Sequence, residues 1–252
     1  MFDVRKQLGY KPTIYLDDGH GIETPGKRTP KMADGSVIRE NQFNAAVVAK
    51  AKAKFESCGF RVVLTAPEVE DVPLKTRIIR ANEDYLMQQK VYPDVDKSKL
   101  GLFFSVHFNA LDGRFGTNEG GVETHFYKTS KNGKALAACV QKHVALGTPQ
   151  RNRGIKGTNL YVNRKTYMPA NLIEFGFMDV EREAHLMLND AYQDESAEEL
   201  FRGACEYLDV VILEDLFKDP AAEEELKTLR AKVKRYEDVI TVIHGVTETA
   251  II

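Results

Sequence analysis

The sequence lacks the features that mark several large classes of protein. Its three cysteines, Cys58, Cys139 and Cys205, are widely spaced and show no zinc-finger or redox spacing, so we interpret them as ordinary core thiols. Lysine and arginine (35) nearly balance aspartate and glutamate (37), which leaves no basic footprint and argues against nucleic acid as the principal partner. No segment approaches membrane-spanning length, so we expect no membrane insertion.

The amino terminus also lacks a secretory signal. The stretch MFDVRKQLGYKP carries charges throughout and contains no apolar segment of the kind that a signal peptide needs. We therefore expect the chain to be made in a cytoplasm without a signal peptide. No long repeat or low-complexity tract is visible.

Short apolar segments rich in β-formers alternate with longer segments of helical period, which predicts an α/β fold with one main domain. The strand segments are almost continuously apolar, as strands covered on both faces are. We expect strands at 13–17, 60–65, 102–106, 122–127 and 170–175. We expect helices from Asp34 or Ser36 to Ser57 and at 74–89, 134–146 and 180–213, the last broken near Asp190, with loops at 112–121 and 151–159.

After Pro220 the sequence changes to a helical segment with a short heptad seam. Its apolar residues step by three and four, and they are Leu226, Leu229, Val233, Tyr236, Ile240 and Ile243. Two interpretations stay open: a terminal helix that packs on the domain, and a short coiled coil that forms a homodimer. We expect the main domain at residues 1–217 and a helical tail at 218–252.

Four side chains that can bind a metal or move a proton stand at strand ends or at a helix start. His20 follows the first strand in LDDGHG, His107 follows the third in FFSVHFNA, and Glu174 lies within the last strand in NLIEFGF. Projecting the first long helix at 100° per residue puts Glu40 in the middle of its apolar stripe, so its carboxylate faces the protein. Because the carboxyl ends of parallel strands gather at one edge of a sheet, the four can converge.

Two histidines and one carboxylate are a recurrent catalytic zinc set, since three protein ligands leave a fourth position open. A further carboxylate outside the metal's shell can take a proton from attacking water, and Glu174 suits that role. A glutamate within an apolar strand is also costly to bury unless it is paired or near a cation. The sequence alone therefore predicts a zinc hydrolase site.

Each residue also has a structural explanation. Either histidine after a strand can be a hydrogen-bonded structural residue, and Glu40 can complement the positive end of its helix, an effect under about 1 kcal/mol. Glu174 can be the buried partner of Arg153 or Arg77. We interpret His125 as structural and the remaining histidines as surface or packing residues, namely His143, His185 and His244.

The quoted segments resemble the zinc-dependent N-acetylmuramoyl-L-alanine amidases of the amidase-3 type. The resemblance runs from about residue 11 to 213 and includes, in family order, LDDGHG, Glu40, GFRVVLT, PLKTRIIRAN, FFSVHFNA, GGVETHFY, NRGIK and PANLIEFGFMD. It implies a twisted, mostly parallel sheet of about six strands flanked by helices. It also implies one Zn²⁺ held by His20, Glu40 and His107, and an essential glutamate at Glu174.

The resemblance implies hydrolysis of the amide between N-acetylmuramic acid and L-alanine in bacterial peptidoglycan, leading to cell-wall lysis. It places Asn109 and Arg153 in the lining of the site as substrate-binding residues, and Arg77 and Asn82 in the helix that follows the second strand. The missing signal and missing wall-binding repeats favour a bacteriophage endolysin that reaches the wall by holin-type release or other non-classical export. A host autolysin is the alternative, and the tail can bind the wall instead of packing or dimerising.

The sequence departs from the family pattern in three places. Asp18 stands where a small residue or proline is usual, and Asp179-Val180 replaces the more usual serine-asparagine. Residues 22–35 form a Pro- and Gly-rich loop whose basic side chains either contact stem-peptide carboxylates or are merely solvated; they are Lys27, Arg28 and Lys31. Two other functions remain open: a non-catalytic peptidoglycan-binding or regulatory protein, and a zinc peptidase that cuts within the stem peptide.

Overall fold

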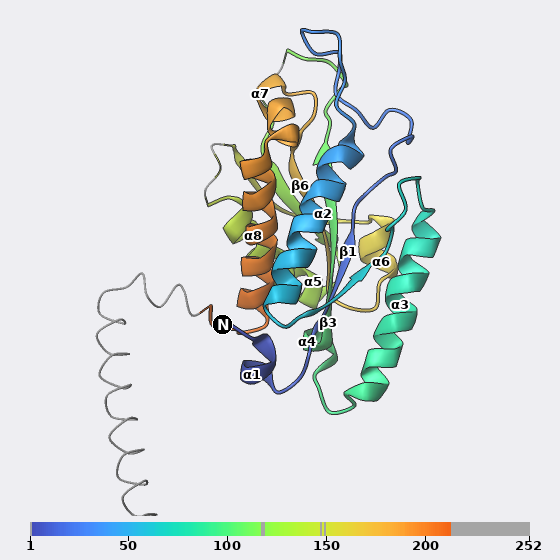
Figure 1. Ribbon diagram of the computed structural model, residues 1–252, viewed down its shortest axis with the longest axis vertical. Coiled ribbons are helices and arrows are strands. Elements are labelled where there is room, and N and C mark those ends of the chain that lie inside the picture. The colour runs from blue at the N-terminus through green and yellow to red at the C-terminus, as the bar shows by residue number, and fades with distance from the viewer. Residues whose placement is uncertain (1, 117–118, 147, 149, 213–252) are drawn as a thin grey trace, which may run out of the picture. The chain divides into compact units, whose positions relative to one another are not determined.

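The computed structural model describes residues 2–116, 119–146, 148 and 150–212 (Figure 1). The predicted boundary at residue 217, the tail and His244 lie outside these residues. In chain order the elements are α1 (Val4–Leu8), β1 (Thr13–Asp17), α2 (Glu40–Ser57), β2 (Arg61–Leu64), α3 (Leu74–Val91), α4 (Lys97–Leu100), β3 (Gly101–Asn109), β4 (Val122–Tyr127), α5 (Lys131–Val144), β5 (Asn152–Thr158), α6 (Tyr161–Lys165), β6 (Ala170–Phe177), α7 (Glu181–Ala184), the 3-10 helix η1 (His185–Leu188) and α8 (Asp190–Tyr207).

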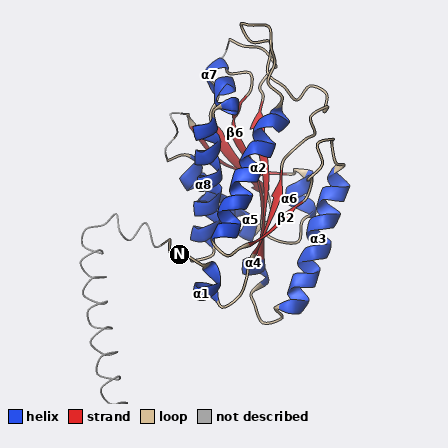
Figure 2. Cartoon of the chain, in the orientation of Figure 1, coloured by secondary structure: helices blue, strands red, loops and turns tan. Residues whose placement is uncertain are grey.

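The strands form one six-stranded sheet in the order β2-β1-β3-β6-β4-β5. Figure 2 shows the strands in red among the helices in blue. Neighbouring strands are parallel throughout, except that β4 and β6 are antiparallel. The predicted α/β class, with a mostly parallel sheet of six strands flanked by helices, is therefore confirmed. Because β1, β3 and β6 are parallel neighbours, their carboxyl ends meet at the same edge of the sheet.

Helices cover both faces of the sheet. Helices α2, α5 and α8 pack together, and α3 packs with α4 and α6. Successive strand residues point to opposite faces. Phe103 accordingly lies in the cluster of buried residues that includes Tyr85 of α3, whereas Phe104 stacks on Phe55 of α2 at 6.5 Å between ring centroids. Two apolar layers thus hold the sheet between the helices.

On the face that α3 covers, the strand residues change from apolar to polar toward the carboxyl ends. The period of two keeps each series of alternate residues on one face of its strand. The series are Tyr15 and Asp17 in β1, Phe103, Ser105 and His107 in β3, and Leu172 and Glu174 in β6. On this face of the sheet, apolar side chains form part of the core at the amino ends of the strands, and polar side chains form a row at their carboxyl ends.

The prediction that residues 151–159 form a loop is wrong, because they contain β5. This strand lies at the edge of the sheet, pairs only with β4 and is half exposed. Its sequence, NRGIKGT, offers little apolar surface, so its position depends on backbone hydrogen bonds that an apolar pattern does not report. Gly154, at a φ of 75°, accompanies a register shift opposite Val122 and Glu123.

The prediction that the first long helix begins at Asp34 or Ser36 is also wrong, since α2 begins at Glu40. Asp34 instead accepts hydrogen bonds from the amide and hydroxyl of Ser36 in a turn. The N-cap is Arg39, whose amide donates to the Gln42 side chain at 2.8 Å. A residue with local hydrogen-bonding capacity can form a turn as readily as a helix cap.

The last helical segment is broken as predicted but ends earlier. Asn189 separates η1 from α8 and caps α8 by accepting from the amide of Tyr192. The helix ends at Tyr207 instead of residue 213, and Asp209 follows it with a left-handed φ of 59°. The short helices α1, α4 and α6 were not predicted.

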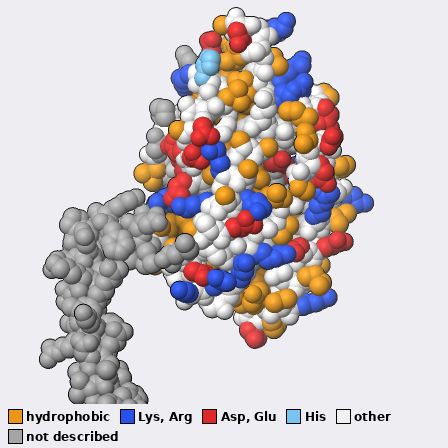
Figure 3. Space-filling model, viewed as in Figure 1, with side chains coloured by type: hydrophobic (Ala, Val, Ile, Leu, Met, Phe, Trp, Pro, Cys, Tyr) orange, Lys and Arg blue, Asp and Glu red, His pale blue; other side chains and the backbone are white. Residues whose placement is uncertain are grey.

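The surface carries charges of both signs. In Figure 3, acidic and basic side chains are interspersed over the face shown, as the balanced composition leads one to expect. Within the described part of the chain, no helix is long and apolar enough to span a membrane.

Candidate metal centre and catalytic glutamate

Three potential metal ligands come from the strand ends and from the start of α2. His20 lies in the turn after β1 with a left-handed φ of 64°, His107 lies near the end of β3, and Glu40 is the first residue of α2. Their ligand atoms all lie within 4.8 Å of one another. The structure therefore brings these three sequence-predicted residues together.

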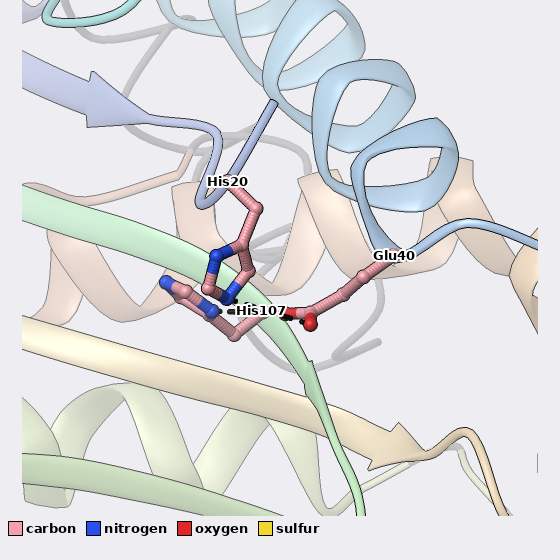
Figure 4. Close-up of side chains that lie close together, drawn as sticks. All are labelled: His20, Glu40 and His107. Carbon is pink, nitrogen blue, oxygen red and sulfur yellow. Dashed lines mark hydrogen bonds and ion pairs between the residues drawn. The ribbon is translucent and has the colours of Figure 1, made fainter. Parts of the chain in front are cut away.

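The carboxylate of Glu40 points toward the imidazoles of both His20 and His107 (Figure 4). Its Oε1 is 2.9 Å from Nδ1 of His107, and its Oε2 is 3.5 Å from Nε2 of His20. The two rings are edge to face, with centroids 5.0 Å apart. Each histidine thus presents one nitrogen to the same small volume.

Backbone and amide hydrogen bonds fix the start of α2 against the turn after β1. The side-chain amide of Asn41 donates to the carbonyl of His20, and that of Asn44 donates to the carbonyl of Gly19 at 2.9 Å. The amide of Glu40 donates to the carbonyl of Lys27. Because these bonds leave Glu40 only 1% exposed, its carboxylate is held inward rather than toward solvent.

The electrostatics of the three residues suit a cation. Burial is the main reason why the pKa of His20 falls to about 4, so its imidazole is neutral at pH 7 and keeps a free lone pair. For Glu40, burial alone would raise the pKa, but the hydrogen bond and charge of His107 outweigh it and lower the pKa. Oε2 of Glu40 is buried without a hydrogen-bond partner. An orphaned carboxylate oxygen facing two imidazole nitrogens fits a bound divalent metal.

Glu174 lies beside this cluster on β6. Its Cα pairs with that of His107 on β3 and with that of Glu123 on β4. Burial raises the pKa of Glu174 to about 8, with the charge of His107 opposing this and the carboxylates of Glu40 and Glu123 adding to it. Its Oε2 is buried without a hydrogen-bond partner. This carboxyl group is therefore available to exchange a proton beside the three ligands.

The alternative interpretation of Glu174 as the buried partner of Arg153 or Arg77 is wrong. Arg153 forms its ion pair with Glu123 at 2.8 Å, and Arg77 forms its closest ion pair with Asp17 at 2.9 Å. Among the described residues, no ion pair of 4.0 Å or less includes Glu174.

Asn109 and Arg153 are both bound to Glu123, a residue that sequence reasoning missed. The Asn109 amide donates to Oε1 of Glu123 at 3.2 Å, and Nε of Arg153 donates to Oε2 at 2.8 Å. His125 lies 3.0 Å from the same carboxylate, which agrees with its predicted structural role. Burial opposes ionisation of Glu123, but its hydrogen bonds to His125 and Arg153 lower its pKa to about 2. An acid within the apolar run VETHFY was the available signal.

A cavity of about 270 Å³ opens beside the two histidines. Residues on its far wall come from the segment before α3 and from α3 itself, and the lining comprises Asp17, Gly19, His20, Asp71, Val72, Pro73, Leu74, Arg77 and His107. On the other side, Nζ of Lys27 lies 4.0 Å from Oε2 of Glu40 and is partly exposed. Of the three basic loop residues, Lys27 is thus the one placed next to the candidate metal ligands.

The structure also bears on the predictions for His143, Asn82 and the cysteines. His143 packs against α8 through a 2.7 Å contact to Glu206, as a packing histidine would. Asn82 ties α3 to the segment after α6 through the carbonyl of Lys165 and the amide of Tyr167. All three cysteines are free, and two are buried.

These features define an α/β protein whose sheet edge carries a candidate three-ligand metal centre with a glutamate beside it. Residues 14–206 match the N-acetylmuramoyl-L-alanine amidase family, and the chain belongs to that family. The resemblance seen in the sequence motifs is therefore confirmed.

Several relatives carry amidase or endolysin names. N-acetylmuramoyl-L-alanine amidase LytC of Bacillus subtilis (strain 168) is 26% identical over 197 residues, which cover 77% of this chain and 35% of that protein. The endolysin of Bacillus phage SPP1 is 30% identical over 207 residues, covering 78% of this chain and 66% of the phage protein. The chain thus spans about a third of LytC.

Solved amidase structures share the fold. The crystal structure of an N-acetylmuramoyl-L-alanine amidase from Clostridium difficile 630 superposes with a TM-score of 0.66 and 28% identity, covering 79% of this chain and 97% of that one. The catalytic domain of CwlV, an amidase from Bacillus (Paenibacillus) polymyxa var. colistinus, superposes with a TM-score of 0.63 and 27% identity, covering 79% of this chain and 99% of that one.

Proposed function

We propose that this protein is a zinc-dependent hydrolase of the amide bond between N-acetylmuramic acid and L-alanine in peptidoglycan, and that its action lyses cell walls. Family membership supports the bond and the substrate. The observation that carries the zinc dependence is the convergence of His20, Glu40 and His107 within 4.8 Å.

In this proposal one zinc ion would be held by His20, through Nε2, and by Glu40 and His107 as the other two protein ligands. A bound zinc ion supplies a Lewis acid that polarises the scissile carbonyl and acidifies water. Glu40 contributes a fixed negative charge, because its burial and the hydrogen bond that the amide of Phe108 on β3 donates to Oε1 prevent it from swinging into solvent. The low pKa of His20 keeps its ring in the neutral form that a metal requires.

Glu174 is the proposed general base and acid. Its carboxyl group accepts a proton from the attacking water and passes it to the leaving amine of L-alanine. A positive ion at the three ligands would lower the raised pKa of Glu174 toward neutrality, the range in which a proton-transfer group works best at pH 7.

Asn109, Arg153 and Lys27 are the proposed substrate-binding residues. Arg153 is held by Glu123 and by the carbonyl of Glu119, and its guanidinium lies 4.7 Å from the centre of the Phe177 ring. A guanidinium fixed in this way is pre-organised for a carboxylate or amide of the stem peptide. Lys27 offers a second cation on the opposite side of the site.

The rest of the chain enters the proposal as follows. Residues 1–217 form the catalytic domain, and residues 218–252 form an appendage that packs, dimerises or binds the wall. The name of the SPP1 relative supports an endolysin. Action at the cell wall after holin-type release or other non-classical export is part of the same proposal. Cleaving the chain after Phe217 and assaying lysis, wall binding and sedimentation separately tests the appendage, since unchanged behaviour in all three would reduce it to packing.

Digestion of purified peptidoglycan, with and without a chelator, tests reaction, bond and metal together. We expect products that begin with a free L-alanine, detected by mass spectrometry, and we expect the chelator to abolish them and added zinc to restore them. Products cut within the stem peptide would mean a zinc peptidase instead. Wall binding without any new peptide would mean a non-catalytic binding protein.

A further inference from the structure

A buried chain of hydrogen bonds leads away from His107 on the side opposite to Glu40. Nε2 of His107 lies 3.1 Å from Oγ of Ser105, and Oγ of Ser105 donates to Oδ2 of Asp17 at 2.5 Å. Ser105 is fully buried and Asp17 is 1% exposed. The chain joins β3 to β1 across the register in which Ser105 pairs with Asp17.

The far end of the chain is a buried ion pair. NH1 of Arg77 lies 2.9 Å from Oδ1 of Asp17, and the hydroxyl of Thr65 donates to the same oxygen at 2.8 Å. Arg77 is itself held by the carbonyl of Val72 and by Asp71. A buried ion pair is stable only when its remaining hydrogen-bonding capacity is satisfied. Here Asp17 accepts from three side chains, so it is an ionised acceptor.

The direction of the hydrogen bonds follows from that charge. An ionised carboxylate can only accept, so the hydroxyl hydrogen of Ser105 points to Asp17. The oxygen of Ser105 then has only lone pairs left for His107, and Nε2 of His107 must donate to it. This leaves Nδ1 as the metal-binding nitrogen of the neutral ring, the atom that faces Glu40 at 2.9 Å.

The backbone at Gly19 lies close to the imidazole ring of His107. A Cβ at this position would lie 2.4 Å from both Cε1 and Nε2 of His107 and 2.8 Å from the carbonyl of Val106. The backbone of the turn after β1 therefore lies close to Cε1 and Nε2 of the ring, which leaves less room for a metal ion at Nε2 than at Nδ1. This steric argument is independent of the hydrogen bonds and gives the same assignment.

We propose that Ser105 and Asp17 are positioning residues that hold His107 in the Nε2-protonated tautomer, so that Nδ1 binds the metal. Arg77 keeps Asp17 charged and in place. The proposal rests on the zinc site of the proposed function. Outer partners of a metal-binding histidine fix its tautomer and orientation, and losing one typically weakens metal affinity by about 10–100-fold.

Ser105→Ala is the sharpest test, because it removes one oxygen from the middle of the chain. We expect zinc to bind about 10–100-fold more weakly to this variant, measured by competition with a chromophoric chelator on the full chain. Asp17→Asn, which removes the charged acceptor, should weaken zinc in the same direction. Thr65→Val is the matched control: it removes a hydrogen bond to Asp17 that does not lead to His107, and its zinc affinity should stay within about threefold of wild type, below the range for outer partners.

A spectroscopic measurement separates positioning from general destabilisation. In the zinc-loaded wild type, ¹⁵N NMR of the histidine side chains should give His107 a protonated Nε2 and a metal-bound Nδ1. Equal zinc affinity in Ser105→Ala and wild type, or a protonated Nδ1 with zinc bound at Nε2, would overturn the proposal. Both readouts are independent of hydrolysis, so an inactive protein with this tautomer would refute only the proposed function, and a wild type without zinc affinity would refute both.

Discussion

Glu174 lies beside His107 in the register of two central strands, with their Cα positions paired between β6 and β3. Neighbours in register point to the same face of a sheet, so the glutamate stands next to a candidate metal ligand without being one of the three. Among the described residues, the ligand group comprises His20, Glu40 and His107. In the proposed function, metal binding and proton transfer therefore belong to different residues, which leads to two distinct predictions.

Replacing Glu174 with glutamine should remove hydrolysis but keep the metal. We expect kcat to fall by about 10²–10⁴-fold, the usual contribution of a general acid or base, because the amide cannot accept a proton from water. The zinc content per protein chain, measured by elemental mass spectrometry, should remain that of wild type. Glu56→Gln, at an exposed glutamate near the end of α2, is the matched control and should change neither. A Glu174→Gln variant with full activity would contradict the assignment.

Alanine at His20 or at His107 should abolish tight zinc binding, because either change leaves only two protein ligands. Zinc at 100 times its dissociation constant should stabilise the wild type by about 2.7 kcal/mol, and the variants should lose this increment. Thermal unfolding with and without zinc measures it. His143→Ala is the control, since that histidine contacts Glu206 instead. If zinc stabilised both ligand variants as much as it stabilises the wild type, the assignment of His20 and His107 as metal ligands would be wrong.

The sequence could predict this site because its members stand at element ends. Strand β1 has the predicted bounds, and the apolar stripe of α2 is buried as the helical projection required. With parallel neighbours, the ends of β1 and β3 meet at one edge, so histidines after those strands converge without any knowledge of loop conformation. The prediction that Glu40 faces the protein interior is confirmed although the predicted helix start was wrong, because the stripe depends on the helical period and not on the first residue.

Contacts that depend on which strands are neighbours, and in which register, could not be predicted from the sequence. Glu123 pairs with Glu174 only because β4 runs antiparallel to β6, and the order β3-β6-β4 brings together strands that are not consecutive in the chain. The link from Ser105 to Asp17 needs the same kind of information. An apolar pattern indicates that a strand exists but not which strand lies beside it, so these partners appear only in the folded chain.

Asp179 should be essential for the loop that follows β3. Its Oδ2 accepts hydrogen bonds from three consecutive backbone amides, those of Leu111, Asp112 and Gly113, at 2.6–2.8 Å. Asp179 is fully buried, so Asp179→Ala would leave these donors without their acceptor. We expect a loss of about 2–4 kcal/mol in the free energy of unfolding, measured in urea. Asp94→Ala, at an exposed aspartate after α3, should change it by less than about 0.5 kcal/mol.

Glu199 should make the protein less stable as pH rises. This residue of α8 is 7% exposed, and burial, with a contribution from the charge of Glu195, raises its pKa to about 8 from an ordinary value of 4.5. Between those two pH values the folded state keeps a proton that the unfolded state has released. The free energy of unfolding therefore falls with increasing pH across this window, by up to about 1.4 kcal/mol per pH unit.

Glu199→Gln removes one of the groups that titrate in this window, Glu174 being another, and should make the fall of stability with pH less steep. We expect the variant to be about as stable as wild type at pH 4.5 and more stable by a few kcal/mol at pH 8, measured by urea unfolding at both values. Glu181→Gln, at an exposed glutamate of α7, should leave the wild-type slope unchanged. A wild-type curve that rises from pH 4.5 to 8 with the same slope in Glu199→Gln would show that Glu199 ionises freely in the folded protein.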